Sequence, residues 1–308
     1  MAAGAWWRDF SLEGRSVRVL KTGALVPVEP GVIGEVIAWL RFHLSVGAAA
    51  PRPDGPSVWF APDRPRPWYL IAPAARLAGL RIADTPERAD LGFFFEDATI
   101  GTPPSRPGLV VINAACRDVS KSHVSKVFEQ VSGRALAVDP ELFHGPVAAK
   151  SETNGAHDGR VVQAPCAAAP GLVYQRLIDT LAEDGMVEDL RCPTVDGEIP
   201  VVFLKRRPLA TRFANSNAEV RKLSPQDVFS AEERGLIKRF CTAMGLDWGG
   251  IDVLRDRRDG LIWIVDVNKT DMGPPTALPL AEKLAATRAL ARALRAYADR
   301  LAGAGGQS

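Results

Sequence analysis

Apolar runs bounded by glycine, proline and polar residues shape the first 115 residues. Short runs of this kind predict buried strands, and two longer segments with helical apolar spacing predict helices between them. The strands are expected at 16–20, 57–62, 91–96 and 108–113, and the helices at 31–44 and 68–80. Strands that alternate with helices indicate a sheet with helices packed on it, so this part is expected to be an α/β lobe.

A second lobe is predicted downstream of a helix at 118–133. Asp118 or Ser120 can cap the start of this helix, and Gly133 can end it. Short apolar runs then predict strands, and a polar turn that contains two glycines, ETNGAHDG at 152–159, separates two of them. The expected strands lie at 135–140, 146–151, 160–165 and 171–179.

Antiparallel strands are expected in the last third of the chain. The segments 187–195 and 198–207 flank an Asp-Gly turn, which predicts a hairpin. A capped amphipathic helix is expected at 230–245 and a long final helix at 280–303. Between these helices, two apolar runs flank the polar turn RDRRDG and predict a second hairpin.

The second hairpin carries the most informative side chains of the chain. Asp266 and Asn268 are two residues apart on its second strand, so both point to one face. If the turn centres near Asp259, Asp252 on the first strand lies directly opposite Asp266. Two neighbouring carboxylates repel each other unless a cation lies between them. Hard oxygen ligands of this kind suit Mg²⁺, which usually obtains its remaining ligands from water and nucleotide phosphates. Strand-end acids that simply face water are the alternative.

Composition narrows the class of protein. The 308 residues exceed one typical domain, so two or three lobes are expected. The net charge of +2 comes from interspersed acids and bases, which argues against nucleic-acid binding. We expect no membrane span, no signal peptide and, from four widely separated cysteines, no structural zinc. No GxGxxG follows an expected strand, which disfavours a dinucleotide site. These features predict a cytoplasmic protein.

The order of motifs resembles the ATP-grasp superfamily. The resemblance runs from about residue 109 to residue 275 and rests on VAAKSETNGAHDG, on VEDLRCP with FLKRRP, and on GIDVLRDRRDGLIWIVDVN. The second of these motifs is similar to the branch that joins amines to carboxylates. The resemblance implies a multi-lobed α/β and α+β fold with an N-terminal, pre-ATP-grasp-like α/β lobe at 1–115. It also implies a linker helix with a small lid lobe at 116–180 and a large lobe, with the metal-binding hairpin and the last helix, at 181–303.

Residue roles follow from the same resemblance. ATP would be held by Lys121 and Lys150, with Lys126 as a competitor for Lys121, and by the glycine turn at Gly155 and Gly159. The strand between the lobes would contact adenine and ribose through Gln175, Arg176, Leu177 and Asp179. Mg²⁺ (or Mn²⁺) would be bound by Asp252, Asp266 and Asn268. Arg191 and Arg206, both expected to face inward, would stabilise the transferring phosphoryl group; surface ion pairs are the alternative for each arginine.

Some positions depart from the pattern of the superfamily. Gln175 stands where an acid is frequent, and Asp266 stands where glutamate is common. Lys269 and Asp271 replace the small residues that usually follow the asparagine, so these two side chains are expected to shape the acceptor site.

The implied activity is ATP-dependent activation of a carboxylate as an acyl phosphate, followed by attack of an amine or a similar nucleophile. Small-molecule carboxylates and amines are then the expected partners, without nucleic acid or membrane, and the resemblance also allows a homodimer. Two alternatives stay open, since fold alone does not decide chemistry. One is a kinase on the same scaffold that phosphorylates a small molecule, and the other is a non-catalytic ATP-binding module.

Overall fold

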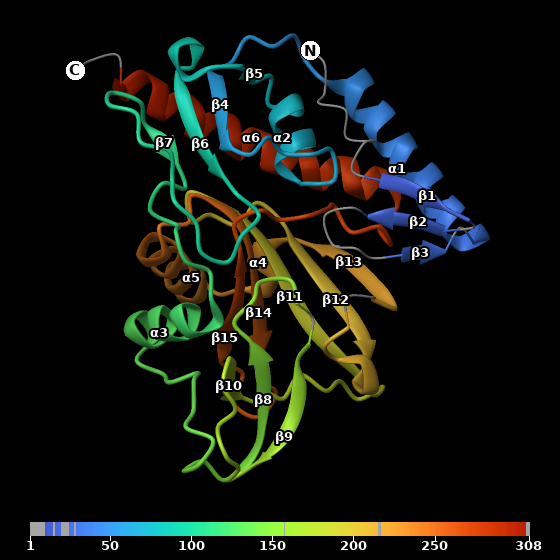
Figure 1. The fold of residues 1–308 in the computed structure, drawn as a ribbon, viewed down its shortest axis with the longest axis vertical. Coiled ribbons are helices and arrows are strands. Elements are labelled where there is room, and N and C mark those ends of the chain that lie inside the picture. Colours follow the sequence, from blue (N-terminus) through green and yellow to red (C-terminus); the bar gives the residue numbers. More distant parts are fainter. Residues whose placement is uncertain are drawn as a thin grey trace.

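The computed structural model describes residues 10–14, 16–19, 25–27, 29–156, 158–214 and 217–305. It contains four sheets and mixes parallel α/β with antiparallel α+β organisation. Figure 1 shows the small sheet of β8–β10 at one end of the molecule and the helices α1, α2 and α6 at the other end, with the five-stranded sheet between them. The predicted fold class, a multi-lobed α/β and α+β protein, is confirmed.

A parallel sheet forms the first lobe, as the unalternating apolar runs predict. Its strand order is β5-β4-β6-β7, and every described pair in it is parallel. The strands are β4 (Ser57–Pro62), β5 (Arg81–Ile82), β6 (Leu91–Phe95) and β7 (Val111–Ile112), with α2 (Ile71–Leu77) and the 3₁₀ turn η2 (Pro86–Arg88) between them. All five residues of β6 are buried, which is expected of a strand covered on both faces.

A separate antiparallel sheet precedes this lobe and was not predicted as a unit. It consists of β1 (Phe10–Glu13), β2 (Ser16–Val19) and β3 (Leu25–Pro27). The next element, α1 (Pro30–Ala49), packs beside α2 and α6. The stretch Gly31–Ala49 is long and apolar enough to cross a membrane by length and composition, which differs from the expectation of no such stretch, although core helices and signal sequences pass the same test.

The second lobe is a three-stranded antiparallel sheet of order β10-β8-β9. It contains β8 (Gly145–Ser151), β9 (Arg160–Ala164) and β10 (Leu172–Arg176). The helix before it, α3 (Lys121–Ser132), starts at the Ser120 cap and ends at Gly133, whose φ of 71° is left-handed. The strand expected at 135–140 is wrong: it is reduced to an isolated bridge between Ala137 and Gln175, because Asp139 already starts a turn.

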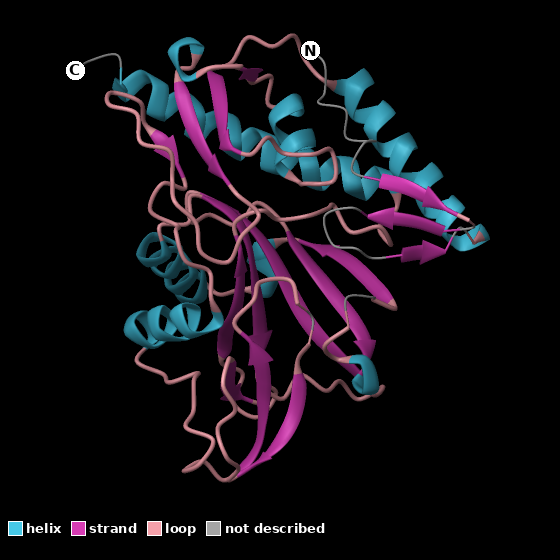
Figure 2. Cartoon of the chain, viewed as in Figure 1, coloured by secondary structure: helices cyan, strands magenta, loops and turns pink. Residues whose placement is uncertain are grey.

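The third lobe is a five-stranded antiparallel sheet of order β13-β12-β11-β14-β15. Its strands are β11 (Met186–Val195), β12 (Val202–Pro208), β13 (Glu219–Leu223), β14 (Trp248–Arg255) and β15 (Ile262–Asn268). The 3₁₀ turn η3 (Leu209–Thr211), α4 (Pro225–Val228) and α5 (Ala231–Met244) connect them. In Figure 2, α3 and α5 lie beside this sheet, and their apolar faces share a buried core with it.

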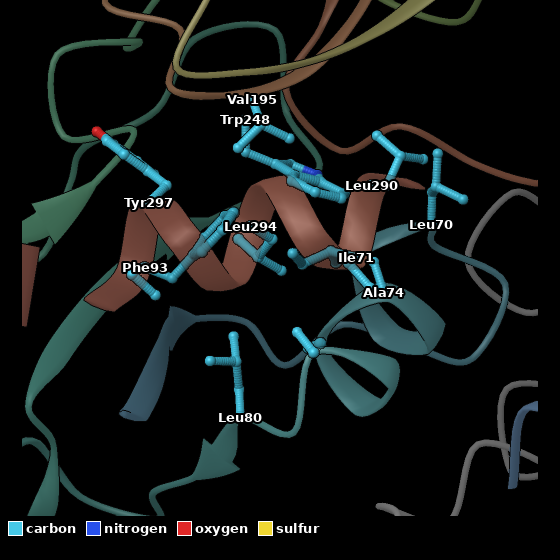
Figure 3. Close-up of a cluster of buried hydrophobic side chains, with 14 of the residues drawn as sticks. Leu70, Ile71, Ala74, Leu80, Phe93, Val195, Trp248, Leu290, Leu294 and Tyr297 are labelled. Carbon is cyan, nitrogen blue, oxygen red and sulfur yellow. The ribbon is translucent and has the colours of Figure 1, made fainter. Parts of the chain in front are cut away.

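The last helix, α6 (Leu280–Gly305), packs into the first lobe. Figure 3 shows Leu290, Leu294 and Tyr297 of α6 beside Ile71 and Phe93, and this cluster also contains Trp248 and Val195 of the large sheet. One core therefore joins elements from both ends of the sequence. The predicted lobe boundaries at 115 and 180 stay a prediction.

Candidate active site

The hairpin of β14 and β15 places two carboxylates opposite each other. Asp252 pairs with Asp266, and Gly250 pairs with Asn268, so Asp252, Asp266 and Asn268 share one face of the large sheet. A bulge between Asp252 and Val253 follows the pair directly. The pair itself is the expected one, although next to the turn Val253 pairs with Ile264, a register that without the bulge would place Asp252 opposite Val265. Both carboxylates stay accessible, with 28% and 24% of their side-chain surfaces exposed.

Arg191 of β11 lies next to this pair. It is directly opposite Asp252 in the sheet, and its Nη1 is 3.1 Å from Asp252 Oδ1. Its Nη2 is 2.7 Å from Oδ1 of Asp271, which follows β15. The arginine is thus a buried cation held between two carboxylates, on the same face as the predicted metal ligands.

The first predicted phosphate lysine reaches the carboxylates from α3. Lys121 is the first residue of the helix, is 8% exposed, and has its Nζ 3.7 Å from Asp266 Oδ1. The same ammonium donates to the backbone carbonyl of Thr153, 3.1 Å away. Lys126, the competing candidate, is exposed on the helix surface. The geometry therefore favours Lys121 over Lys126.

Lys150 of β8 is the second lysine of the site. Its Nζ donates to Gln175 Oε1 at 3.0 Å, and Gln175 Nε2 donates to Ser125 Oγ at 3.0 Å. Gln175 is 1% exposed. Both ends of the Gln175 amide are thus bonded within the protein, where it orients Lys150, and its contact to a purine stays a prediction.

The glycine turn between β8 and β9 folds onto α3 and the first lobe. Glu152 accepts from the backbone N–H and hydroxyl of Ser122, so it lies at the N-terminus of α3. Asn154 N–H donates to Thr99 Oγ1 at 2.9 Å. Gly155 has a φ of +71°, which favours glycine. At Gly159, an added Cβ would lie 2.6 Å from the ring of Phe213, so the close approach requires glycine.

The surroundings shift the pKa values of the two carboxylates in opposite directions. Burial alone would raise the pKa of Asp252, but the charges of Arg191 and Lys205 outweigh it and hold this pKa below its ordinary value. Burial raises the pKa of Asp266, and the negative charge of Asp252 adds to this, although Lys121 and Lys150 oppose it. Burial also lowers the pKa of Lys150, against the nearby charge of Asp266. Charges of both signs, from α3, the small sheet and the large sheet, therefore act on one another here.

The donor set fits a divalent cation that arrives with a nucleotide. Asp266 Oδ1 is buried without a hydrogen-bond partner, and Asp252 lies directly across from it. Asn268 Oδ1 accepts from the backbone N–H of Thr270 at 2.9 Å and, with the single hydroxyl proton of Thr270 donated to Asp97 Oδ1, retains one lone pair on the same face. One or two carboxylates with phosphate oxygens is the usual Mg²⁺ arrangement. Within the described ranges, no three His, Cys, Asp or Glu side chains are grouped to hold a metal.

Arg206 does not join the site, and the expectation that it faces inward with Arg191 is wrong. It lies opposite Glu188 and Glu219, on the other face of the sheet from Arg191. Its guanidinium pairs with three carboxylates: Asp184 at 2.6 Å, Glu188 at 3.1 Å and Glu219 at 2.8 Å. The alternative interpretation, a structural ion pair, describes this arginine.

Two basic residues that the sequence did not single out share the face of Arg191 instead. Lys205 lies opposite Asp189 in the sheet, and burial lowers its pKa against the opposing charge of Asp252. Arg207 Nη2 is 2.7 Å from Asp189 Oδ2. The alternation of side chains along β12 could have identified them, because residues 203, 205 and 207 point to the same face of the sheet.

The strand between the lobes, β10, ends at Arg176, and an irregular segment continues from it to the large sheet. Arg176 is exposed and donates from Nε to the carbonyl of Ala135 at 2.9 Å. Leu177 and Asp179 are partly exposed, and Asp179 Oδ1 accepts from the backbone of Leu181 at 3.1 Å. These residues connect the small and large sheets, as expected, and their contacts to a nucleotide stay a prediction. The segment RFANSN also suggests Asn215 for substrate binding, and this residue lies outside the described residues.

The fold and site thus define a protein in which a small antiparallel sheet contributes a lysine, and a helix another, to a carboxylate pair on a larger sheet. No family model matches the chain. No curated protein matches it.

Solved structures that resemble the chain include ATP-grasp ligases, the superfamily indicated by the sequence motifs. The D-alanine–D-alanine ligase from Bacillus anthracis has a TM-score of 0.48 at 12% identity, covering 80% of this chain and 98% of that one. The ligase PsnB with minimal precursor, Mg and ADP has a TM-score of 0.46 at 14% identity, covering 75% and 96%. The RimK domain ATP-grasp protein from Sphaerobacter thermophilus has a TM-score of 0.43 at 14% identity, covering 77% and 98%. Two further PsnB structures are matched over 62% and 65% of the PsnB chain.

Proposed function

We propose that the protein is an ATP- and Mg²⁺-dependent ligase that activates a carboxylate as an acyl phosphate and joins it to an amine or a similar nucleophile. The observation that carries the proposal is the meeting of Lys121, Lys150 and Arg191 with the Asp252–Asp266 pair. These residues come from three separate parts of the fold, yet Lys121 Nζ lies 3.7 Å from Asp266 and Arg191 Nη1 lies 3.1 Å from Asp252. Cations grouped around a metal-binding carboxylate pair suit a nucleotide triphosphate.

The two lysines would bind the phosphates. Both ammonium groups are largely covered by protein, and Lys150 is oriented by Gln175. Charge neutralisation and positioning supply most of the catalysis of phosphoryl transfer, so this step needs little acid–base chemistry. A carboxylate oxygen of the substrate would attack the γ-phosphorus, and ADP would leave.

Asp252, Asp266 and Asn268 would hold Mg²⁺ or Mn²⁺. When bound, the ion supplies neutralisation of the phosphate charge and relieves the repulsion between the two carboxylates.

Arg191 and the loop at 151–156 would complete the reaction. Arg191 would neutralise the phosphoryl group and then the acyl phosphate. The amine nitrogen would attack the acyl carbon, inorganic phosphate would leave, and the amine would lose a proton. The loop already bonds to α3 and to Thr99, so it is placed to exclude water, which would otherwise hydrolyse the acyl phosphate.

The first experiment measures phosphate release from ATP with Mg²⁺ against panels of amino acids and small carboxylates. We expect ADP, phosphate and an amide or ester product. A phosphorylated acceptor would instead indicate a kinase, and tight ATP binding without turnover across the panel would indicate a binding module. A cytoplasmic location and a homodimer stay predictions that cell fractionation and sedimentation would test.

The second experiment tests the metal ligands. Asp266→Ala and Asn268→Ala should each lower turnover by about 100-fold or more and weaken Mg²⁺-dependent ATP binding, with the fold retained. Asp259→Ala is the matched control, because this aspartate lies in the turn of the same hairpin and accepts a hydrogen bond from the backbone of Leu261. Full activity of both ligand variants would refute the metal assignment.

A further inference from the structure

The guanidinium of Arg191 donates hydrogen bonds on two sides, to carboxylates of two different segments. Asp271 Oδ1 accepts from Nη2 at 2.7 Å and from Nε at 3.3 Å. Asp252 Oδ1 accepts from Nη1 at 3.1 Å. These bonds use three of the five N–H groups of a guanidinium and leave one on each terminal nitrogen. The arginine is therefore fixed in orientation and still able to donate two hydrogen bonds.

The first lobe in turn holds Asp271 in place. The backbone N–H of Leu70 donates to the carbonyl of Asp271 at 2.8 Å. The hydroxyl of the adjacent Thr270 donates to Asp97 Oδ1 at 3.0 Å, and Asp97 Oδ2 accepts from Tyr69 at 2.7 Å. Asp271 itself is 3% exposed. Its position is thus set by the lobe that the superfamily resemblance does not cover.

The room for this contact exists because residue 250 is a glycine. A Cβ at Gly250 would lie 2.4 Å from Asp271 Oδ2 and 2.7 Å from Arg191 Nε. Any side chain there would displace the arginine or the aspartate. The close packing of Arg191 against Asp271 therefore depends on the glycine at position 250, and the three residues lie on three neighbouring segments.

Arg191 has more carboxylate partners than a structural ion pair needs. One carboxylate would neutralise Arg191, but two lie against it, and Asp271 Oδ2 is buried without a hydrogen-bond partner. A buried charge with an unsatisfied oxygen lowers stability, so its retention points to a functional use.

We propose that Asp271 is the positioning residue of Arg191: it turns the two remaining N–H groups toward the oxyanion of a bound carboxylate or phosphoryl group. Asp271 does not contact the substrate and acts only through the arginine. The catalytic effect of Asp271 rests on the proposed function. The binding of a guanidinium group by Asp271 does not depend on that function.

The kinetic test uses Asp271→Asn, which keeps the shape of the side chain and removes its charge. We expect kcat to fall by about 30- to 100-fold while KM for ATP changes by less than about threefold, because the phosphate and metal ligands are untouched. Asp256→Asn is the matched control, since Asp256 is also 3% exposed and pairs with an arginine, Arg258 at 2.6 Å, but lies in the hairpin turn. Unchanged kcat in Asp271→Asn would overturn the proposal.

The binding test needs no substrate and separates the two proposals. Arg191→Ala leaves a space between Asp252 and Asp271 that the guanidinium ion should fill. At 20 mM guanidinium chloride, against equal sodium chloride, we expect Tm to rise by about 2 °C in Arg191→Ala and not at all in Arg191→Ala/Asp271→Asn. If turnover exists, guanidinium should restore part of it only in the first variant. Equal behaviour of the two variants would overturn the role of Asp271, and a Tm effect without any turnover would count against the proposed function alone. If Arg191→Ala does not fold, the kinetic test still decides.

Discussion

Arg206 and Arg191 have opposite surroundings although both lie on neighbouring strands of one sheet. Arg206 has three carboxylate partners on the face away from the charged site. Arg191 has two carboxylate partners on the face of the predicted metal ligands. The two arginines therefore allow stability and activity to be separated by matched substitutions.

Arg206→Ala should lower the free energy of unfolding by about 1–2 kcal/mol, because it leaves three carboxylates without their shared cation. ATP turnover should change by less than about threefold. Arg191→Ala should instead lower turnover by about 100-fold. Urea unfolding and phosphate release measured on both variants check the prediction, and a large loss of turnover in Arg206→Ala would contradict it.

The prediction that Arg206 faces the same way as Arg191 is wrong because of the register between their strands. A tight Asp-Gly turn pairs Val195 with Glu198, and this register continued along the strands would put Arg206 on the face of Arg191. The ladder instead pairs Arg191 with Phe203, a shift of one residue. Pro200 lies in the interrupted segment and has no N–H to donate, and a one-residue slip reverses every side chain. The sequence predicts the two strands, and the irregular connection between them decides which side chains share a face.

At the scale of elements, the hairpin of β14 and β15 was predictable because its signals are local. The two apolar runs and the polar turn predict the hairpin, and the bulge between Asp252 and Val253 shifts its register by one residue to give the Asp252–Asp266 pair. The partners of Asp271 and of its neighbour Thr270 could not be predicted in this way, because Leu70 and Asp97 come from the distant first lobe. The same limit applies to Gln175, whose contacts to Lys150 and Ser125 depend on how α3 packs against the small sheet.

Helix α5 offers a test at this scale. It starts with a capping box in which Ser230 accepts from the N–H of Glu233 and Glu233 accepts from the N–H of Ser230. Ser230→Ala should lower the free energy of unfolding by about 1 kcal/mol. Ser224→Ala, at the start of α4, is the control, because that serine makes no side-chain cap bond and should have a smaller effect. Chemical denaturation of both variants decides, and equal effects would contradict the prediction.

The packing of α1 on its neighbours predicts a pH effect. Burial, with the charge of Arg76, lowers the pKa of His43 from its ordinary value near 6.5 to about 4, and the rings of Trp39 and Phe42 lie against it. Between pH 6.5 and 4 the unfolded chain binds a proton at this histidine that the folded chain does not bind. The free energy of unfolding should therefore fall as the pH falls through this window, by at most about 3 kcal/mol.

Unfolding of the wild type and of His43→Gln at pH 7 and pH 5 measures this contribution. The loss between the two pH values should be smaller in His43→Gln. His144→Gln, at an exposed histidine of the second lobe, should lose as much as the wild type. Identical losses in all three proteins would show that His43 does not contribute.

At the scale of the whole molecule, the core around Trp248 makes the first lobe depend on the last helix. Leu294 is 1% exposed and lies in the cluster with Phe93 and Ile71 (Figure 3). Leu294→Ala should lower the free energy of unfolding by about 3 kcal/mol. Amide hydrogen exchange should accelerate in β4 and β6 of the first lobe, although these strands lie some 200 residues away in sequence. Faster exchange confined to α6 would contradict this view of the core.

This late helix has a consequence for synthesis on the ribosome. The strands β4, β6 and β7 emerge early, but Leu290, Leu294, Tyr297 and Ala298, which cover them, are translated near the end of the chain. Since a ribosome adds roughly 5–20 residues per second, the apolar face of the nascent first lobe stays uncovered for about 10 seconds or more. During that interval it is a natural substrate for chaperones that hold growing polypeptides, and folding of the first lobe is completed only after α6 has been synthesised.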